Sequence, residues 1–165
     1  MALKPVQIQG TLKDINDNFD TLNPLASGDA VGLGLLRVAR FEFDAGVVAN
    51  RTVAAHITGV TLPANAIVVG GFYDVNTAFT SASTNTGEIA ISVQAANDIL
   101  STLAVSDAKL GTIGRKAIVP KANTPESTSV KTSAAKEITC TVAVAALTAG
   151  KLTGYLYYVE GAVSA

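Results

Sequence analysis

The stretch Lys136–Gly161, KEITCTVAVAALTAGKLTGYLYYVEG, decides the fold class of this chain. The apolar side chains of its first half alternate with smaller or polar ones; they are Ile138, Cys140, Val142 and Val144. Side chains on a β-strand have period two, so one face is expected on a core and the other in solvent or against a partner. The second half, Leu152–Glu160, holds three of the four tyrosines. The link Leu147–Lys151 is short and contains a glycine, which predicts a β-hairpin placed in the middle of a sheet.

The same alternation recurs upstream. Strands are expected at Leu36–Asp44, Arg51–Thr58, Ala66–Phe79 and Glu88–Gln94. The pair Gly70-Gly71 predicts a kink or a close backbone approach. The segment from Asn97 fits either a short helix or a strand, and residues 106–136 are expected to be mostly loop, with a strand near Ser129–Lys131. About seven or eight strands without helix–strand alternation predict an all-β, jelly-roll-like antiparallel β-sandwich.

The sandwich is expected to span residues 35–165, preceded by an extended N-terminal arm and linker at residues 1–34. One short helix is expected in the arm, where four apolar residues follow a 3-4-3 spacing; they are Leu12, Ile15, Phe19 and Leu22. Pro24 ends this helix, and about 13 residues are marginal for an isolated helix in water. The helix must therefore dock, either on its own domain or on copies of itself or another protein. We expect the four apolar residues to be assembly or partner-binding anchors.

The composition limits the choice of function. Charged residues make up only 15% of the 165 residues, against about 25% in a typical soluble domain. Either some outer surface is covered in the working state, or the low value is incidental. The net charge of −1 and the lack of a basic run give no nucleic-acid footprint. No apolar stretch approaches the ~18 residues of a membrane helix, and the N-terminus lacks the apolar core of a secretory signal. We therefore expect a soluble protein made in a cytoplasm.

Catalytic chemistry has little support in the sequence. An active site needs converging groups, and the chain has one histidine and one cysteine. Cys140 is expected to be a buried structural thiol, and His56 to lie on the polar face of its strand. Asp14, Asp17 and Asp20 lack the rest of a calcium-binding loop. We predict no catalytic, cofactor-binding or metal-binding residues, and no enzymatic activity.

The tyrosines leave one alternative open. They are Tyr73, Tyr155, Tyr157 and Tyr158. They can build a sugar-binding platform, or they can serve as aromatic residues of the core and of an interface.

Three stretches carry a resemblance to a known family. They are TLKDINDNFDTLN at 11–23, GGFYDVNTAFTSASTNTGEIAISVQAANDIL at 70–100 and VKTSAAKEITCTVAVAALTAGKLTGYLYYVEG at 130–161. Together they cover about half of the chain, and they resemble small structural proteins of tailed bacteriophages. The shared motifs are structural and not catalytic.

The resemblance implies a capsid decoration (cement) or head-fibre protein with a jelly-roll-like body. Such a protein would be made in the host cytoplasm and would act on the virion as a homotrimer. It would bind the major capsid protein on the capsid surface, without a cofactor, nucleic acid or membrane. Two alternatives stay open, a glycan- or receptor-binding β-module on the virion and a small virion-associated hydrolase.

Overall fold

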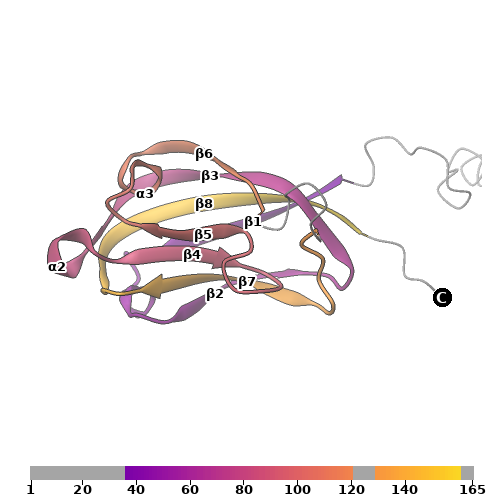
Figure 1. The fold of residues 1–165 in the computed structure, drawn as a ribbon, viewed down its shortest axis with the longest axis horizontal. Helices are drawn as coiled ribbons and strands as arrows, with labels where there is room; N and C mark the ends of the chain where they lie inside the picture. Colours follow the sequence, from indigo (N-terminus) through magenta and orange to yellow (C-terminus); the bar gives the residue numbers. More distant parts are fainter. Residues whose placement is uncertain (1–35, 121–128, 161–165) are drawn as a thin grey trace, which may run out of the picture. The chain divides into compact units, whose positions relative to one another are not determined.

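The computed structural model describes residues 36–120 and 129–160, which form two antiparallel four-stranded sheets packed face to face (Figure 1). The first sheet, in spatial order, contains β1 (Leu36–Asp44), β8 (Leu147–Glu160), β3 (Ala66–Ser81) and β6 (Gly114–Ile118). The second contains β2 (Ala55–Leu62), β7 (Lys136–Ala143), β4 (Glu88–Ser92) and β5 (Leu100–Ala104). Three short helical segments connect them: η3 (Val48–Arg51), α2 (Ala82–Asn85) and α3 (Ala108–Gly111). The predicted arm at residues 1–34 lies outside the described residues.

The order of pairing is that of a rolled-up hairpin. β4 pairs with β5, β3 with β6, β2 with β7 and β1 with β8, all antiparallel. Each pair is further apart in sequence than the one before it, and alternate pairs fall in opposite sheets. The two orders β1-β8-β3-β6 and β2-β7-β4-β5 follow from this winding. The predicted jelly-roll-like sandwich is confirmed.

The core lies between the sheets and is built by the period-two alternation. On β1, Ala39, Phe41 and Phe43 are buried while the residues between them are exposed. On β7, Ile138, Cys140 and Val142 are buried, as predicted. The largest buried side chains come from both sheets; they include Tyr73, Phe41, Phe79, Leu62, Ile89, Ile91, Ile138, Leu152 and Leu156.

The predicted hairpin at the end of the chain is wrong, although both of its strands are inner strands of a sheet. β7 pairs with β2 and β4, and β8 pairs with β1 and β3, so the two strands belong to different sheets. Residues 144–146 carry the chain from one sheet to the other. Val144 has a φ of 66° and is exposed, so it does not continue the buried row of β7. Alternation predicts a buried face equally well for a hairpin and for two facing strands, so it could not distinguish them.

Two glycines let strands and rings approach closely. A Cβ atom on Gly71 would meet the carbonyl oxygen of Tyr155, as the predicted close approach requires. The register of β3 against β8 also shifts between Val68 and Gly70, which is the predicted irregularity. A Cβ atom on Gly154 would meet the ring of Phe41. These contacts explain glycine inside strands, where it otherwise weakens the sheet.

The segment expected to be mostly loop contains regular structure. It holds α3 and β6, and β6 pairs with the middle of β3 at Gly71–Val75. The ambiguous segment after Asn97 forms β5, which pairs with β4. The strand expected near Ser129–Lys131 is reduced to one isolated bridge between Lys131 and Ile67. No helix in the described part of the chain is long and apolar enough to cross a bilayer.

Candidate partner-binding surface

The anchors predicted from the sequence lie outside the described residues. They are Leu12, Ile15, Phe19 and Leu22, and their role stays a prediction. The description of a site therefore concerns the β-sandwich.

The single cysteine and the single histidine both take structural positions. Cys140 is completely buried, and this burial raises the pKa of its thiol to about 12. A thiol with so high a pKa is a poor nucleophile at neutral pH. His56 does not lie on a solvent face as predicted. It is half-buried, its ring centroid is 5.8 Å from that of Phe43, and its Nε2 is 2.8 Å from the carbonyl oxygen of Thr52. The expected parity of β2 is reversed, because Ile57 faces outward.

The four tyrosines divide into two pairs. Tyr73 is fully buried, and its hydroxyl donates a hydrogen bond of 3.1 Å to the carbonyl oxygen of Lys109. Burial raises the pKa of Tyr73 to about 12. Tyr158 is partly buried and packs on the core. Tyr155 and Tyr157 have the opposite parity on β8 and face outward. Of the four tyrosines, two therefore belong to the core, Tyr73 and Tyr158, and two lie on the surface.

Tyr155 and Tyr157 build an aromatic cluster with Phe72 of β3. Phe72 stands directly opposite Tyr155 in the register, with ring centroids 4.7 Å apart and an interplanar angle of 23°. Tyr157 meets Phe72 edge-on at 6.0 Å and 62°. We call the outward side of the β1-β8-β3-β6 sheet, centred on these three rings, the aromatic face. Tyrosine and arginine are among the residues most enriched in the energetic centres of protein interfaces.

Arg115 of β6 completes this cluster and is held from two sides. Its guanidinium carbon lies 4.3 Å from the centroid of the Phe72 ring, a cation–π contact. Its Nε and Nη2 donate to the two carboxylate oxygens of Asp74 at 2.9 and 3.0 Å. The hydrogen bonds from Arg115 lower the pKa of Asp74, and Asp74 in turn raises the pKa of Arg115. The guanidinium plane is therefore positioned before any partner binds.

The Phe72 ring is enclosed by its neighbours in this cluster. β6 and β8 lie on opposite sides of β3, so Arg115 and Tyr155 cover opposite faces of the Phe72 ring. Phe72 therefore has no free ring face for the stacking of a sugar, so a sugar-binding platform on this face would have to use the rings of Tyr155 and Tyr157.

The charges of the aromatic face neutralise one another. Its outward side chains on the strands include three cations and three carboxylates: Arg40, Lys151, Arg115, Glu42, Asp44 and Asp74. Lys151 Nζ lies 2.8 Å from Glu42 Oε1 and 3.3 Å from Asp44 Oδ2. The hydrogen bonds with Glu42 and Asp44 raise the pKa of Lys151, and the backbone N–H of Gly46 together with Lys151 lowers the pKa of Asp44. Each of these six groups already has a partner of opposite charge on the same face.

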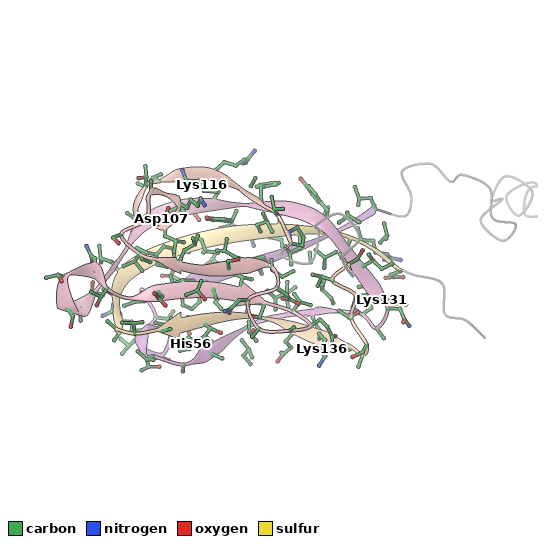
Figure 2. The ribbon with its side chains drawn as sticks, viewed as in Figure 1. His56, Asp107, Lys116, Lys131 and Lys136 are labelled. Carbon is green, nitrogen blue, oxygen red and sulfur yellow. The ribbon has the colours of Figure 1, made fainter. Side chains whose placement is uncertain are left out.

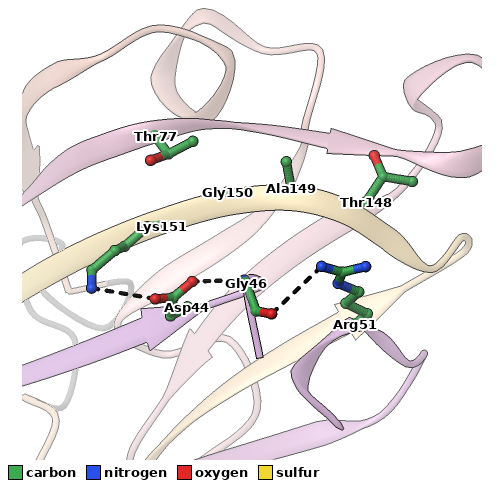
Figure 3. A pocket seen from close by; sticks show the side chains of 8 residues that line it. All are labelled: Asp44, Gly46, Arg51, Thr77, Thr148, Ala149, Gly150 and Lys151. Atoms are coloured by element: carbon green, nitrogen blue, oxygen red, sulfur yellow. Dashed lines mark hydrogen bonds and ion pairs between the residues drawn. The ribbon is translucent and has the colours of Figure 1, made fainter. Parts of the chain in front are cut away.

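A shallow pocket of about 250 Å³ lies at one end of this sheet (Figure 3). Its polar lining includes Asp44, Arg51, Thr148 and Lys151. Arg51 Nε donates to the carbonyl oxygen of Ala45 at 2.7 Å, and Lys151 is paired with carboxylates, so both cations are engaged within the chain. The pocket is also smaller than the ~300 Å³ at which ligand pockets usually begin. The contacts among the lining residues hold the local structure together. They do not bring together the groups that a catalytic site needs.

Other ionisable groups are scattered. Figure 2 labels five of them, with Asp107 and Lys116 at one end of the body, Lys131 and Lys136 toward the other end, and His56 separate from both pairs. Within residues 36–120 and 129–160, no three histidine, cysteine or acidic side chains come together as metal ligands would.

The class of fold is thus an eight-stranded jelly-roll-like sandwich with one preformed aromatic face. No protein family and no curated protein matches the sequence. Three solved structures share the fold. A chain of the capsid of the Helicobacter pylori bacteriophage KHP30 is 18% identical with a TM-score of 0.53, over 79% of this chain and 92% of that one.

The other two are similar to the same extent. A chain of the cyanophage Pam1 capsid has 16% identity and a TM-score of 0.54, covering 82% of this chain and 92% of its own length. A chain of the capsid of Ralstonia phage GP4 has 17% identity and a TM-score of 0.51, covering 82% and 89%. The fold of this chain is therefore one that occurs in the capsids of three bacteriophages.

Sequence reasoning named the four tyrosines but did not divide them between core and surface. The parity of β8, on which Leu152 and Leu156 are buried, is the signal that could have placed Tyr155 and Tyr157 on the outer face. The contribution of Arg115 was not visible, because β6 was read as loop and its pairing with β3 joins residues about 40 positions apart.

Proposed function

We propose that this protein is a virion structural component that binds the outer surface of a phage capsid. In this proposal it assembles as a homotrimer, contacts the major capsid protein and cements or decorates the shell. The observation that supports it best is the likeness of the fold, over most of the chain, to chains of three phage capsids. The preformed, charge-neutral aromatic face supports a binding role.

The mechanism requires no chemistry. A specific protein interface buries about 1,600 Å² in total, and many copies on one lattice add avidity without new kinds of contact. A body that sits across a junction between capsid subunits lowers the free energy of the closed shell by the binding free energy it gains there. The stabilisation is lost only when several such contacts open together.

The arm is the proposed tether. Its predicted short helix carries an apolar stripe, formed by Leu12, Ile15, Phe19 and Leu22. A helix of this length is marginal by itself in water, so we expect the stripe to dock on another surface. A linker follows at residues 25–34, so the arm has the length to reach a neighbouring subunit, at about 3.3 Å per extended residue.

The experiment compares capsids that lack this protein before and after addition of the purified full-length chain. We expect saturable co-sedimentation with the capsids and a rise in the temperature at which they release DNA. The variant Ile15→Asp/Phe19→Asp should lose both effects. A charge-matched control, Asn16→Asp/Asn18→Asp, changes the polar side of the same helix and should bind like the wild type.

Two outcomes would overturn the proposal. One is a chain that does not bind capsids at any concentration tested. The other is a chain that binds a defined glycan on an array while leaving the capsid unchanged, which would make it a receptor-binding module.

A further inference from the structure

One end of the aromatic face is an apolar patch. It lies where β1 begins, β8 ends and β3 begins, and the register of these three strands places its residues side by side on the outward face. Leu36, Val38 and Val69 are 45, 55 and 48% exposed, and the other members are half-buried. We call this surface the terminal patch; its residues are Leu36, Val38, Ile67, Val69, Tyr157 and Val159.

The ion pairs of the aromatic face lie outside the terminal patch. They are at positions 40–44, 74, 115 and 151, nearer the other end of the sheet. Arg37 and Glu160 pair at the patch end, with Arg37 Nε 3.1 Å from Glu160 Oε1. Arg37 stands opposite Tyr158, which packs on the core, so this pair belongs to the inward parity and only borders the patch. A partner on the patch therefore covers apolar side chains without covering an ion pair.

A lysine borders the terminal patch on its third side. Lys131 forms a β-bridge with Ile67, on the side of β3 that faces away from β8. Its neighbours Val130 and Thr132 are buried, so the exposed Lys131 lies on the outward side together with Ile67. None of the ion pairs among the described residues includes Lys131. Figure 2 shows it at the end of the body where β1 begins. The patch therefore favours a partner that combines apolar side chains with carboxylates.

The N-terminal arm has this chemistry and the matching length. The apolar stripe of its predicted helix runs from Leu12 to Leu22, about 15 Å at about 1.5 Å per residue. The patch is about as wide, because three strand spacings of about 4.8 Å separate β1 from Lys131, or ~14 Å in all. The other sides of the helix carry an excess of acid, with three aspartates and one lysine: Asp14, Asp17, Asp20 and Lys13.

The arm also joins the body at this patch. Leu36, the first residue of β1, follows the arm directly in sequence. Residues 24–35 separate the predicted helix from β1 and can span at most about 40 Å, at about 3.3 Å per residue. That reach exceeds the width of the patch, so the helix can cross to a neighbouring copy. Once a ring of copies has begun to close, a tethered segment acts at an effective concentration of the order of millimolar, so it needs less contact area than a free partner does.

We propose that the predicted arm helix of one copy, residues 11–23, docks on the terminal patch of a neighbouring copy. This deepens the proposed function and rests on it, because in that proposal the arm crosses between subunits of a trimer. Arm and patch are unlike surfaces, so each copy gives one arm and receives one, and the third contact closes the ring. Arg115 supports the patch indirectly, since it holds Phe72, against which Tyr157 packs.

Cysteine pairs test this contact in the full-length chain. Cys140 is completely buried, so introduced thiols are the reactive ones. Asn16→Cys lies halfway along the predicted stripe but outside it, and Val69→Cys lies in the patch on β3, so either direction of the helix brings the two together. After treatment with a short bis-maleimide, we expect covalent dimers and trimers of the double variant on a denaturing gel. Each single variant should stay monomeric.

A matched control combines Asn16→Cys with Val144→Cys. Val144 is also an exposed valine, but it lies just before β8 begins, whereas the patch lies where β8 ends. This pair should not crosslink. Three results would overturn the inference. Dimers from Asn16→Cys alone would mean that two arms pack together. A monomer bridged within itself, identified by its intact mass, would mean that the arm docks on its own body. A double variant without any crosslink would mean that the arm does not reach the patch.

A charge reversal tests the lysine at the border. Lys131→Glu places a carboxylate where the acidic sides of the helix would lie, so the trimer should dissociate at a protein concentration several-fold higher than for the wild type, measured by light scattering. Its melting temperature should change little, because the residue is exposed. Lys136→Glu makes the same change of net charge at the start of β7, in the other sheet, and is the control. Equal effects of the two variants would contradict the inference.

Capsid binding by the same samples separates the inference from the proposed function. If Asn16→Cys/Val69→Cys forms crosslinked trimers but the wild-type chain does not bind capsids, the inference holds and the capsid role is rejected. If the wild-type chain binds capsids and the double variant is not crosslinked on or off the capsid, the capsid role holds and the inference is rejected.

Discussion

The ring of Phe41 lies over Gly154, its direct partner on the neighbouring strand. A methyl group at position 154 would occupy the space of the ring, and Phe41 is buried on all sides. Gly154→Ala should therefore cost about 1–3 kcal/mol of the free energy of unfolding, the range for overpacked cores. Urea denaturation at neutral pH measures it.

The control for this variant is Gly59→Ala. No atom lies within 4 Å of a Cβ at Gly59, so an alanine there meets no steric clash. Its φ of +75° leaves backbone strain as the only cost, about 1 kcal/mol of the free energy of unfolding. If Gly59→Ala costs more than Gly154→Ala, ring overlap is not what requires glycine at 154.

Asp98 stabilises the turn after β4. Its buried carboxylate accepts hydrogen bonds from the backbone N–H groups of Val93, Gln94 and Ala95, at 2.8–2.9 Å. Asp98→Ala leaves these donors without their partner and should cost at least about 2 kcal/mol. The half-buried Asp107 accepts one such bond, from Lys109 N. Asp107→Ala should cost about 1 kcal/mol, and equal losses in a thermal melt would contradict this account.

Alkaline pH should destabilise the sandwich through two buried groups. The pKa values of Cys140 and Tyr73 are raised from 9.0 and 10.0 to about 12 in the folded chain. Their contribution to stability is complete below the unfolded pKa values. It is lost as the pH rises from about 9 to 12, because the unfolded chain releases these protons first.

Urea titrations at pH 8, 10 and 11 test this dependence. The loss approaches about 1.4 kcal/mol per pH unit for each group within its window. Tyr73→Phe should flatten the decline above pH 10, since it removes one of the two titrating groups. A decline as steep as that of the wild type would show that Tyr73 does not cause it.

Arg115→Lys should weaken binding without unfolding the chain. Lysine cannot keep both bonds to Asp74 and the planar contact with Phe72. Because the ion pair is exposed, the free energy of unfolding should change by less than about 1 kcal/mol. Self-association, measured by light scattering across a dilution series, should weaken several-fold. Lys116→Arg at the next position of the same strand, a half-buried residue, is the control. Equal effects of the two variants would contradict a special role for Arg115.

The alternation of apolar residues predicted the buried rows of β1, β4 and β7, because burial on one face is what the pattern records. It could not assign β7 and β8 to different sheets, since either arrangement buries the same residues. β6 was missed because a short edge strand, GRKAI, has little apolar content to alternate. On β2 the pattern was present but its direction was wrong. The row Val53, Ala55 and Ile57 was read as core and lies outside, whereas Val60 packs on the core.

That error is informative about the surface. A row of apolar residues on a strand normally indicates a buried face. On β2 the other sheet of the sandwich does not bury this row. Ile57 of this row is 67% exposed, so the pattern records an apolar surface of the chain and not part of its core.

The last two strands of the chain, β7 and β8, are inner strands of the two sheets. Until both have left the ribosome, β1 and β3 have no common neighbour, and neither do β2 and β4. Contacts between such distant segments form slowly, so we expect the sandwich to fold only after both β7 and β8 have been synthesised. A prematurely terminated chain would then lack any stable sheet with a binding surface. Only chains that include both β7 and β8 would then be able to join an assembly.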